Sequence, residues 1–444
     1  MPIEPKLLKG FRDYLPDVMA PRQAMLRTIE AVFERQGFLP LMTPALEYAE
    51  TLTGKYGEEG DKLLYQFADH GERQVALRYD LTVPLARVVA QHRGALAMPL
   101  RRYQIAPVWR ADKPQRGRFR EFVQCDADIA GANSAVADAE VLLTGLAVLA
   151  ALGIDGAVLH LNHRHVLTGL LAAAGVTDEA TQFACVRAID KLDKVGVDGV
   201  RAELGRVEGV TEAIASEILA LFADPELSLA RIRDLLATRA GYDEARLAGS
   251  IGRLQQVVAL VEAAGLGGQL RVDPTIARGL DYYTGIIYET RLTHPKVASM
   301  GAVMSGGRYD GLIGMFGKEA VPAVGISLGL DRLLAALLEL GLVATAGAVP
   351  VYVTVFAEAQ AGDSLRLAQH LRAQGLAVEV DTLGGKLGKQ LERASKRGSR
   401  LAVVVGPEEA AAGEVVLKDL AAGTQEKLGH GALAPRVQAL LAAG

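Results

Sequence analysis

The order of apolar and polar residues first predicts a helix near the start of the chain. In the stretch RQAMLRTIEAVFERQGF, residues 22–38, apolar side chains recur at helical spacing and the pattern ends at Gly37. The apolar positions are Met25, Ile29, Val32 and Phe33. The next segment, LPLMTPALE, is strand-like but contains Pro40 and Pro44. Because proline lacks a backbone donor, we expect this strand to lie at a sheet edge or in an interface.

Short strand-like runs dominate the next part of the chain. VALRYDL (75–81), RRYQIAPVWR (101–110) and REFVQCDADI (120–129) follow one another and are joined by charged connections. This succession is typical of an antiparallel sheet. From about residue 165 to 255 the pattern changes to Ala, Leu and Glu at helical spacing, interrupted by glycine-containing breaks. We therefore expect a separate helical insertion here.

Strands resume at QLRVDPTIARGLDYYTGIIYETRL, and a linker rich in Ala and Gly, VATAGAVP, follows. Beyond the linker the strand VYVTVF, the helix LRLAQHLRAQ, the strand AVEV, a basic helix and the strand LAVVVG alternate. This alternation predicts a mostly parallel α/β domain at the C-terminal end. The fold class expected for the whole chain is α/β, with an α+β first domain. We place the parts at residues 1–162, 163–260, 261–342 and 343–444.

Composition narrows the class of protein. A length of 444 residues favours two or three domains, and a net charge of -4 excludes a generally basic nucleic-acid coat. Cys125 and Cys185 belong to no CxxC pair, so neither a disulfide framework nor a zinc site is indicated, and a reducing cytoplasm fits best. No signal peptide is predicted at the N-terminus. The most apolar window contains Glu339 and Pro350, which argues against a membrane span.

The chain lacks the common nucleotide-binding loops. The nearest candidate, GMFGKE, has Glu319 where a P-loop needs Ser or Thr, and no GxGxxG joins a strand to a helix. The segment WRADKPQRGRFREF is instead strongly basic and is predicted to be a loop between two strands. Arginine forks there could hold phosphate groups, although a solvated charged loop would have the same composition. The basic residues are Arg110, Lys113, Arg116, Arg118 and Arg120.

The strand after this loop carries polar residues where a core would need apolar ones. Alternation places Phe122, Gln124, Asp126 and Asp128 on one face. Because buried carboxylates need cations or donors, this face is predicted to form the floor of a ligand pocket. Cys125 points to the opposite face, where a buried small apolar residue is the expected role.

Three further segments combine glycines with polar or charged residues. RGLDYYTG places Arg278, Tyr282 and Tyr283 at the start of a strand, where an arginine and two phenols suit an anionic ligand, unless Arg278 only pairs with Asp281. MSGGRYDGL has paired glycines that allow close approach to a ligand, and AVGISLGLDRLLAAL is a glycine-bearing strand that leads into a helix.

With these motifs together, the chain resembles the histidyl-tRNA synthetases, a family of class II aminoacyl-tRNA synthetases. GFRDYLP and GFLPLMTPALE resemble the N-terminal signature and motif 1, with Pro44 as the motif proline. YQIAPVWRADKPQRGRFREFVQCDADIAG resembles motif 2, VPAVGISLGLDRLL motif 3, and RGLDYYTG and SGGRYDGL the two histidine-specific segments. The resemblance implies a class II antiparallel sheet flanked by helices, a helical insertion and a C-terminal anticodon-binding domain.

The resemblance also implies roles in binding ATP. Arg110 would hold the α-phosphate, with Arg278 approaching from the opposite side in a role that a metal ion plays in related enzymes. Asp112 and Phe122 would hold or stack on adenine. Arg118 would contact the outer phosphates, and Arg332 would contact adenine and the γ-phosphate. ATP would bring Mg²⁺ with it, and no metal site built from protein ligands is expected.

The histidine site is implied in the same way. Asp80 and Thr82 would bind the ammonium group, and Gln124 the carboxylate. Asp128 and Tyr283 would bind the imidazole, because both ring nitrogens need partners. Tyr282 and Tyr309 would lie nearby, and Arg278 would border the same site.

Contacts with tRNA(His) are expected in two places. Gln115 and Arg120 of the motif 2 loop would meet the acceptor end. The segment GGKLGKQLERASKRGSR is basic with only Glu392 opposing, which suits an RNA backbone, although a solvated helix face would look the same. Its basic residues are Lys386, Lys389, Arg393, Lys396, Arg397 and Arg400. His160, His163 and His165 lack carboxylate or Cys neighbours in sequence and predict no metal site.

Two functions are compatible with this resemblance. The first is an enzyme that activates histidine with ATP and transfers it to tRNA(His), acting as a cytoplasmic homodimer paired through motif 1 and away from any membrane. The second is a synthetase-like, histidine-sensing regulatory subunit of ATP phosphoribosyltransferase. Such paralogues typically lack the anticodon-binding domain. The presence of Arg110, Arg278, Arg332 and the C-terminal segment favours the enzyme.

Overall fold

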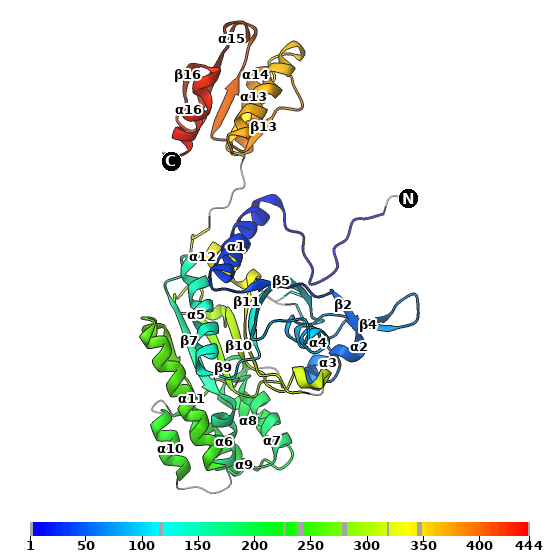
Figure 1. Cartoon of the computed structure of the whole chain (residues 1–444), viewed down its shortest axis with the longest axis vertical. Helices are drawn as coiled ribbons and strands as arrows, with labels where there is room; N and C mark the ends of the chain where they lie inside the picture. Colours follow the sequence, from blue (N-terminus) through cyan, green and yellow to red (C-terminus); the bar gives the residue numbers. More distant parts are fainter. Residues whose placement is uncertain are drawn as a thin grey trace. The chain divides into compact units, whose positions relative to one another are not determined.

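The protein was studied as a computed structural model, which describes residues 3–114, 119–224, 228–237, 243–277, 282–317, 319–343 and 349–442. This part of the chain forms two compact units, built mainly from residues 22–343 and 349–442. Figure 1 shows the elements of each unit. Within the described ranges, no helix combines the length and the apolar character that crossing a membrane requires.

An eight-stranded sheet forms the centre of the first unit. From β5 to β7 every neighbouring pair is antiparallel, and the short strands β1 and β8 pair parallel at the two edges. The predicted antiparallel sheet and the edge position of Pro40 are therefore confirmed. The order is β1 (Leu39–Pro40), β5 (Leu100–Trp109), β6 (Glu121–Ala130), β11 (Ala323–Gly329), β10 (Met304–Arg308), β9 (Ile286–Leu292), β7 (Ala157–His163) and β8 (Leu270–Val272).

Helices and a small sheet complete this framework. The predicted apolar face of α1 (Pro16–Arg35) is buried, and Met25, Ile29, Val32 and Phe33 are each at most 4% exposed. Helix α1 ends before Gly37, which adopts φ +78°. The other elements are α2 (Ala49–Leu52), α3 (Gly57–Asp61), α4 (Thr82–His92), α5 (Ala135–Ala151), α12 (Leu330–Glu339) and a sheet of β2 (Leu46–Tyr48), β4 (Gln74–Leu77) and β3 (Gln66–Ala68).

The helices between β7 and β8 begin at residues that favour helix starts. Side chains of Asp178, Thr211 and Asp243 accept hydrogen bonds from the first turns of α7, α9 and α11. Helix α11 returns along α5 and so brings the helical segment back to the sheet, as Figure 1 shows. The helices are α6 (Arg164–Ala173), α7 (Glu179–Ile189), α8 (Leu192–Leu204), α9 (Glu212–Ala223), α10 (Leu229–Ala237) and α11 (Glu244–Ala263).

The second unit is a five-stranded sheet with helices. Strands β13, β12 and β14 are parallel, as the alternation of strands and helices predicted, but β15 and β16 are antiparallel, so the sheet is mixed. Only four residues join β15 to β16, with Gly423 at φ +69°, and a parallel pair would need a much longer crossover. The elements are β12 (Val351–Val353), α13 (Ala361–Ala373), β13 (Val378–Val380), α14 (Leu387–Lys396), β14 (Leu401–Val404), α15 (Pro407–Ala412), β15 (Glu414–Asp419), β16 (Thr424–Gly429) and α16 (His430–Ala442).

Glycines in β10 and β11 clear space for polar side chains above the large sheet. Gly307 and Gly325 are cross-strand partners, and Gly325 also pairs with Asp128 of β6. A Cβ atom on Gly325 would lie 1.7 Å from Asp128 Oδ1, and one on Gly307 would lie 2.7 Å from the Tyr283 ring. These strands therefore need glycine because a carboxylate and an aromatic ring occupy the space of their side chains.

We expect Gly325→Ala to displace the Asp128 side chain from its partners. Overpacking of this kind costs about 1–3 kcal/mol of unfolding free energy, measurable as a lower midpoint of urea unfolding. Gly329→Ala is the matched control on the same strand, because a Cβ there lies 3.9 Å from its nearest neighbour. Equal stability of the two variants would contradict the close contact between Gly325 and Asp128.

Candidate active site

The first centre of the site is the buried carboxylate of Asp80, which is 2% exposed and lies two residues before the first residue of α4. Its Oδ1 accepts hydrogen bonds from the backbone N–H groups of Thr82 and Val83, at 3.2 and 3.0 Å, and thereby caps the helix. Tyr56 donates to the same oxygen at 3.1 Å, and Tyr282 donates to Oδ2 at 3.2 Å. Burial raises the pKa of Asp80, although these donors and Arg110 oppose the rise.

The second centre is Asp128, near the end of β6 and 3% exposed. Tyr309 donates to its Oδ1 at 2.5 Å. Arg102 Nη2 lies 2.8 Å from Oδ2 as an ion pair, yet within the described residues Oδ2 accepts no well-aligned hydrogen bond. This oxygen can therefore still accept a hydrogen bond from a polar ligand.

A second carboxylate on the same face, Asp126, increases the local negative charge. It is 2% exposed, and burial together with the neighbouring Asp128 raises its pKa. Burial also raises the pKa of Asp128, and the Arg102 guanidinium opposes the rise at both residues. Arg102 itself is fully buried on the neighbouring strand β5, where Nη2 donates to Leu81 O at 3.1 Å. The alternation on β6 thus correctly predicted a polar, buried inner face.

Three tyrosine rings link the two carboxylates. The ring of Tyr282 lies 5.0 Å from that of Tyr283 and 5.9 Å from that of Tyr309, both in edge-on arrangements. Burial is the largest cause that raises the pKa of all three phenols, and the nearby carboxylates add to it. The phenols consequently stay protonated, and two of them act as hydrogen-bond donors, Tyr282 toward Asp80 and Tyr309 toward Asp128.

Arg110 supplies a fixed cation beside this cluster. Its Nε donates to Tyr79 O at 3.0 Å, and its guanidinium lies 4.2 Å from the Tyr79 ring centroid and 5.1 Å from that of Phe122. Among the described residues Arg110 has no ion-pair partner within 4.0 Å. A half-buried cation that is oriented but not neutralised suits an anionic ligand.

Gln124 and Arg332 lie at the junction of β6, β11 and α12. Gln124 Nε2 donates to Ser327 Oγ at 2.6 Å, and its Oε1 is buried without a hydrogen-bond partner in the described structure. Arg332 donates from Nη1 to Ala302 O. Asp331 is buried, and it accepts a hydrogen bond from Val123 N at 3.2 Å, which holds the start of α12 against β6.

Asp331 also binds two arginines from the N-terminal part of the chain. Arg12 Nη2 lies 2.6 Å and Arg22 Nε 3.4 Å from its Oδ1. Arg12 additionally lies over the Phe119 ring, 3.9 Å from its centroid. The Asp331 carboxylate therefore connects helix α12, strand β6, helix α1 and the segment before α1.

Other predicted site residues have different positions. Arg120 Nε donates to Asp112 O at 3.0 Å and its Nη1 to Lys9 O at 3.3 Å, so its guanidinium stabilises the chain around the motif 2 loop. Arg278, Gln115 and Arg118 lie outside the described residues. His160 pairs with Asp273 at 2.9 Å, a carboxylate far away in the sequence, and the described residues contain no cluster of three metal-binding side chains.

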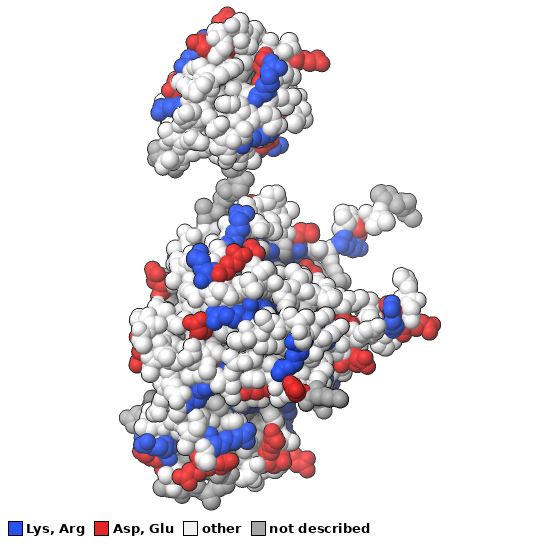
Figure 2. All heavy atoms as spheres, in the orientation of Figure 1, with Lys and Arg blue, Asp and Glu red and all other residues white. Residues whose placement is uncertain are grey.

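The basic segment of the second unit is partly neutralised by distant carboxylates, which corrects the expectation that only Glu392 opposes it. Arg393 binds the buried Asp381 at 2.6 Å, Arg397 pairs with Glu379, and Arg400 lies 3.7 Å from Asp419. Lys396 pairs with Glu392 at 2.7 Å. Lys386 and Lys389 are exposed at the start of α14. Figure 2 likewise shows positive and negative side chains interspersed on the face it displays.

Sequence reasoning missed Tyr56, Arg102 and Ser327, although the structure brings them to the site. Arg102 and Ser327 occupy strands next to β6, at positions paired with Asp128 and Asp126. The sequence held one clue to Arg102: the negative charges of Asp126 and Asp128 on β6, which require a buried cation on a neighbouring strand. The side chain of Tyr56 left no comparable sign.

Comparison with known proteins identifies relatives along nearly the whole chain. The family described as histidyl-tRNA synthetase matches residues 10–333, and that described as anticodon binding domain matches residues 350–440. The chain is 46% identical over 424 residues to a histidine–tRNA ligase of Rhodopirellula baltica, with 94% of each chain covered. It is 40% identical over 448 residues to a histidine–tRNA ligase of Aeropyrum pernix, with 98% of each chain covered.

Solved structures agree in fold. A histidyl-tRNA synthetase from Nostoc matches with a TM-score of 0.83 and 33% identity, covering 98% of this chain and 99% of the other. A Bacillus halodurans protein described as an ATP phosphoribosyltransferase regulatory subunit/histidyl-tRNA synthetase matches with a TM-score of 0.72. At 23% identity, over 88% of this chain and 97% of the other, it supports the fold alone.

Replacing the buried cation by an apolar residue, Arg102→Met, would remove the positive charge that opposes the burial cost of Asp126 and Asp128. We expect a loss of about 3–5 kcal/mol in unfolding free energy. Because burial raises the carboxyl pKa values in the folded state, this state binds more protons than the unfolded one, and stability falls as pH rises toward the folded-state pKa. Urea unfolding should therefore show a larger loss at pH 8 than at pH 5.

Asp128→Asn in the Arg102→Met background tests the cause, because it removes one of the uncompensated carboxylates. It should restore part of the stability at pH 8. A double variant no more stable than Arg102→Met at both pH values would mean that charge is not what Arg102 balances.

Proposed function

The chain belongs to the histidyl-tRNA synthetase family, and from this premise we propose how its residues carry out the reaction. It is an ATP-dependent aminoacyl-tRNA synthetase that joins histidine to tRNA. The enzyme is favoured over a regulatory subunit because the named relatives are histidine–tRNA ligases and because an anticodon-binding domain is present. In two steps, histidine and ATP form histidyl-adenylate and pyrophosphate, and histidine is then transferred to the 3′ end of tRNA(His).

Histidine recognition rests on the two buried carboxylates, and this is the observation that carries the proposal. The ammonium group would lie at Asp80 and Thr82, where a cation would lower the raised pKa of Asp80. The imidazole would lie between Asp128 and Tyr283, with a ring N–H donating to the Asp128 oxygen that lacks an aligned donor. Because a ligand without two ring nitrogens would leave buried polar groups unpaired, the site would strongly discriminate against it.

The remaining histidine contacts orient the reacting group. Gln124 is held by Ser327, and its amide would bind the substrate carboxylate. Tyr282 and Tyr309 do not need to touch the substrate, since each already donates to one of the two carboxylates and fixes its position. Such preorganisation reduces the entropy that substrate binding and reaction would otherwise cost.

Arg110 and Arg278 would act on the α-phosphate of ATP. In the reaction, a carboxylate oxygen of histidine attacks the α-phosphorus and pyrophosphate leaves, so negative charge concentrates at the phosphorus oxygens. Preorganised guanidinium groups stabilise this charge without reorganising during the step. The stacking of Arg110 against Tyr79 and Phe122 supplies such preorganisation on one side. Arg278 is assigned to the opposite side on family resemblance alone.

The rest of the ATP would lie along β6 and the start of α12. Phe122 would stack on adenine, Asp112 would bind its edge, and Arg332 would reach adenine and the γ-phosphate, with Arg118 on the outer phosphates. Asp331 supports this arrangement by holding α12 against β6. A Mg²⁺ that enters with ATP would be held mainly by phosphate oxygens and water. This ion would neutralise phosphate charge.

Contacts with tRNA are assigned to two surfaces. Exposed Lys386, Lys389, Lys396 and Arg397 on and beside α14 would follow the RNA backbone. Gln115 and Arg120 are assigned to the acceptor end, although Arg120 already makes two hydrogen bonds to the backbone. Both ATP and tRNA are cytoplasmic, so we place the enzyme in the cytoplasm.

A homodimer formed through the motif 1 edge is part of the proposal. Strand β1 lies at the edge of the large sheet, and apolar side chains of β1 and of the residues that follow it stay exposed, Leu39 at 68% and Met42 at 69%. An apolar edge of this kind favours pairing with a second copy of the chain.

Exchange of pyrophosphate into ATP, measured with Mg²⁺ and without tRNA, tests the chemistry. Exchange should require histidine, and Arg110→Ala should reduce its rate on the order of a hundredfold or more, as should Arg278→Ala. Arg93→Ala, which removes a surface cation paired with Glu319, is the control and should leave the rate unchanged. Histidine binding without any pyrophosphate exchange would contradict the proposed enzymatic activity and indicate a histidine-sensing protein.

Sedimentation equilibrium tests the dimer. The wild type should sediment as a dimer. In the Leu39→Glu variant the monomer–dimer equilibrium should shift toward the monomer, because dimerisation would bury a charge in the paired edge. Leu365→Glu is the matched control, since Leu365 is 51% exposed on α13 of the second unit. A wild-type monomer at micromolar concentration, or a Leu39→Glu dimer as tight as the wild type, would contradict the interface.

A further inference from the structure

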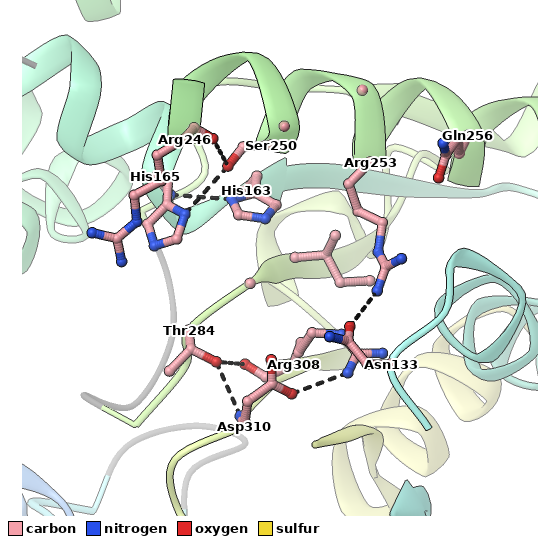
Figure 3. A pocket seen from close by; sticks show the side chains of 14 residues that line it. Asn133, His163, His165, Arg246, Ser250, Arg253, Gln256, Thr284, Arg308 and Asp310 are labelled. Carbon is pink, nitrogen blue, oxygen red and sulfur yellow. Dashed lines mark hydrogen bonds and ion pairs between the residues drawn. The ribbon is translucent and has the colours of Figure 1, made fainter. Parts of the chain in front are cut away.

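A separate pocket of about 510 Å³ lies between the helical insertion and the large sheet. Its upper wall in Figure 3 comes from α11 and the end of β7, and its lower wall from the loop before β9 and the end of β10. Thr284 and Gly285 of the lower wall directly follow Tyr283 in sequence. None of the residues assigned above to histidine or ATP lines this pocket.

The charge of the lining is predominantly positive. Arg246, Arg253 and Arg308 face the pocket, against Asp310 in the lining and the buried Asp138 behind it. Arg308 is saturated by Asp138, Asp310 and Ala132 O. Arg253 binds Asp138 at 2.8 Å and Asn133 Oδ1 at 2.8 Å. The exposed Arg246 has no ion-pair partner among the residues that the structure describes, so an excess cation remains at the opening.

Hydrogen bonds of the two pocket histidines determine where their protons lie. The Nδ1 atom of His163 accepts from His165 N at 3.2 Å, so a neutral His163 carries its proton on Nε2 as a donor. Ser250 Oγ donates to Arg246 O at 2.8 Å and is therefore an acceptor for His165 Nδ1–H at 3.2 Å. A neutral His165 then has its lone pair on Nε2, and protonation turns that nitrogen into a donor.

The charges around these histidines oppose their protonation. Burial is the main cause that lowers the pKa of His163 to about 3, and His165, Arg253, Arg246 and Arg308 add to it. Burial likewise lowers the pKa of His165 to about 4, with Arg246 and Arg164 contributing and Asp243 opposing. An anion in the pocket would oppose these effects and favour protonation of His165 at Nε2, whereas Nδ1 of His163 already accepts the His165 N–H.

We propose that this pocket binds a phosphate group, held by Arg246, His163 and His165 with Arg253 on the wall. Three groups can bind an oxyanion here: the guanidinium of Arg246, the Nε2–H of His163, and the Nε2 of His165 once it is protonated. The volume exceeds what a single phosphate would fill, and so the phosphate belongs to a larger molecule, either the RNA backbone or a small phosphorylated compound.

Arg246→Gln tests the assignment through two binding measurements on the full-length protein. Inorganic phosphate is titrated by calorimetry, and an unmodified tRNA(His) transcript by filter binding over a range of salt concentrations. Arg233→Gln, which removes an exposed cation from α10 outside the pocket, is the matched control and should match the wild type. Arg246→Lys should bind more tightly than Arg246→Gln but less tightly than the wild type, because lysine keeps the positive charge but lacks the planar guanidinium that makes two parallel hydrogen bonds.

The two sources of phosphate give different results. If the RNA backbone occupies the pocket, Arg246→Gln should weaken tRNA binding about tenfold and lower the slope of log affinity against log salt by about one. If the occupant is a small phosphorylated compound, affinity for inorganic phosphate should fall about tenfold while tRNA binding stays unchanged. Unchanged affinity for both probes would overturn the proposal.

The protonation of the histidines provides an independent readout. Sulfate, which stays a dianion between pH 5.5 and 8, should bind the wild type more tightly as pH falls, because the complex binds more protons than the free pocket. A variant with His163→Asn and His165→Asn should lose most of this pH dependence while it remains folded by circular dichroism. The same pH dependence in wild type and variant would show that the imidazoles do not contact the anion.

Discussion

The first unit depends above all on the burial of one negative charge, the carboxylate of Asp128. A carboxylate in the interior of a protein is costly unless a cation and donors surround it. Here Arg102 comes from β5, Tyr309 from the end of β10, and the space for the side chain from Gly325 on β11. Three strands must therefore keep their register for one side chain. A shift of a single residue would turn Asp128 away from all three.

The second carboxylate, Asp80, is stabilised in another way. It lies at the start of α4, where backbone N–H groups and the helix dipole favour negative charge, and two phenols complete its partners. The site thus holds two buried anions whose partners differ, one a guanidinium and the other a set of neutral donors. The tyrosine rings pack edge-on between them, so aromatic packing helps to fix the distance between the two anions.

Much of this was predictable from the sequence, for reasons that differ between residues. The alternation of Gln124, Asp126 and Asp128 correctly placed the polar face of β6, and Pro40 correctly placed β1 at an edge, because both follow from backbone geometry. The positions of Arg102 and Ser327 could not be predicted in this way, since they depend on which strands become neighbours. The burial of Asp331 could not be predicted either, because it depends on long-range contacts with Arg12 and Arg22. Local sequence carries no record of such contacts.

The same use of a shared buried carboxylate links the helical insertion to the active site. Asp138 on α5 is fully buried and binds both Arg253 of α11 and Arg308 of β10. Arg308 directly precedes Tyr309, the residue that holds Asp128. If α11 moved away, Asp138 would lose one of its two cations, and Arg308 alone would have to balance Asp138 and Asp310. The position of the insertion and the geometry around Asp128 are therefore energetically connected through adjacent residues of one strand, although the two sites share no ligand-binding side chain.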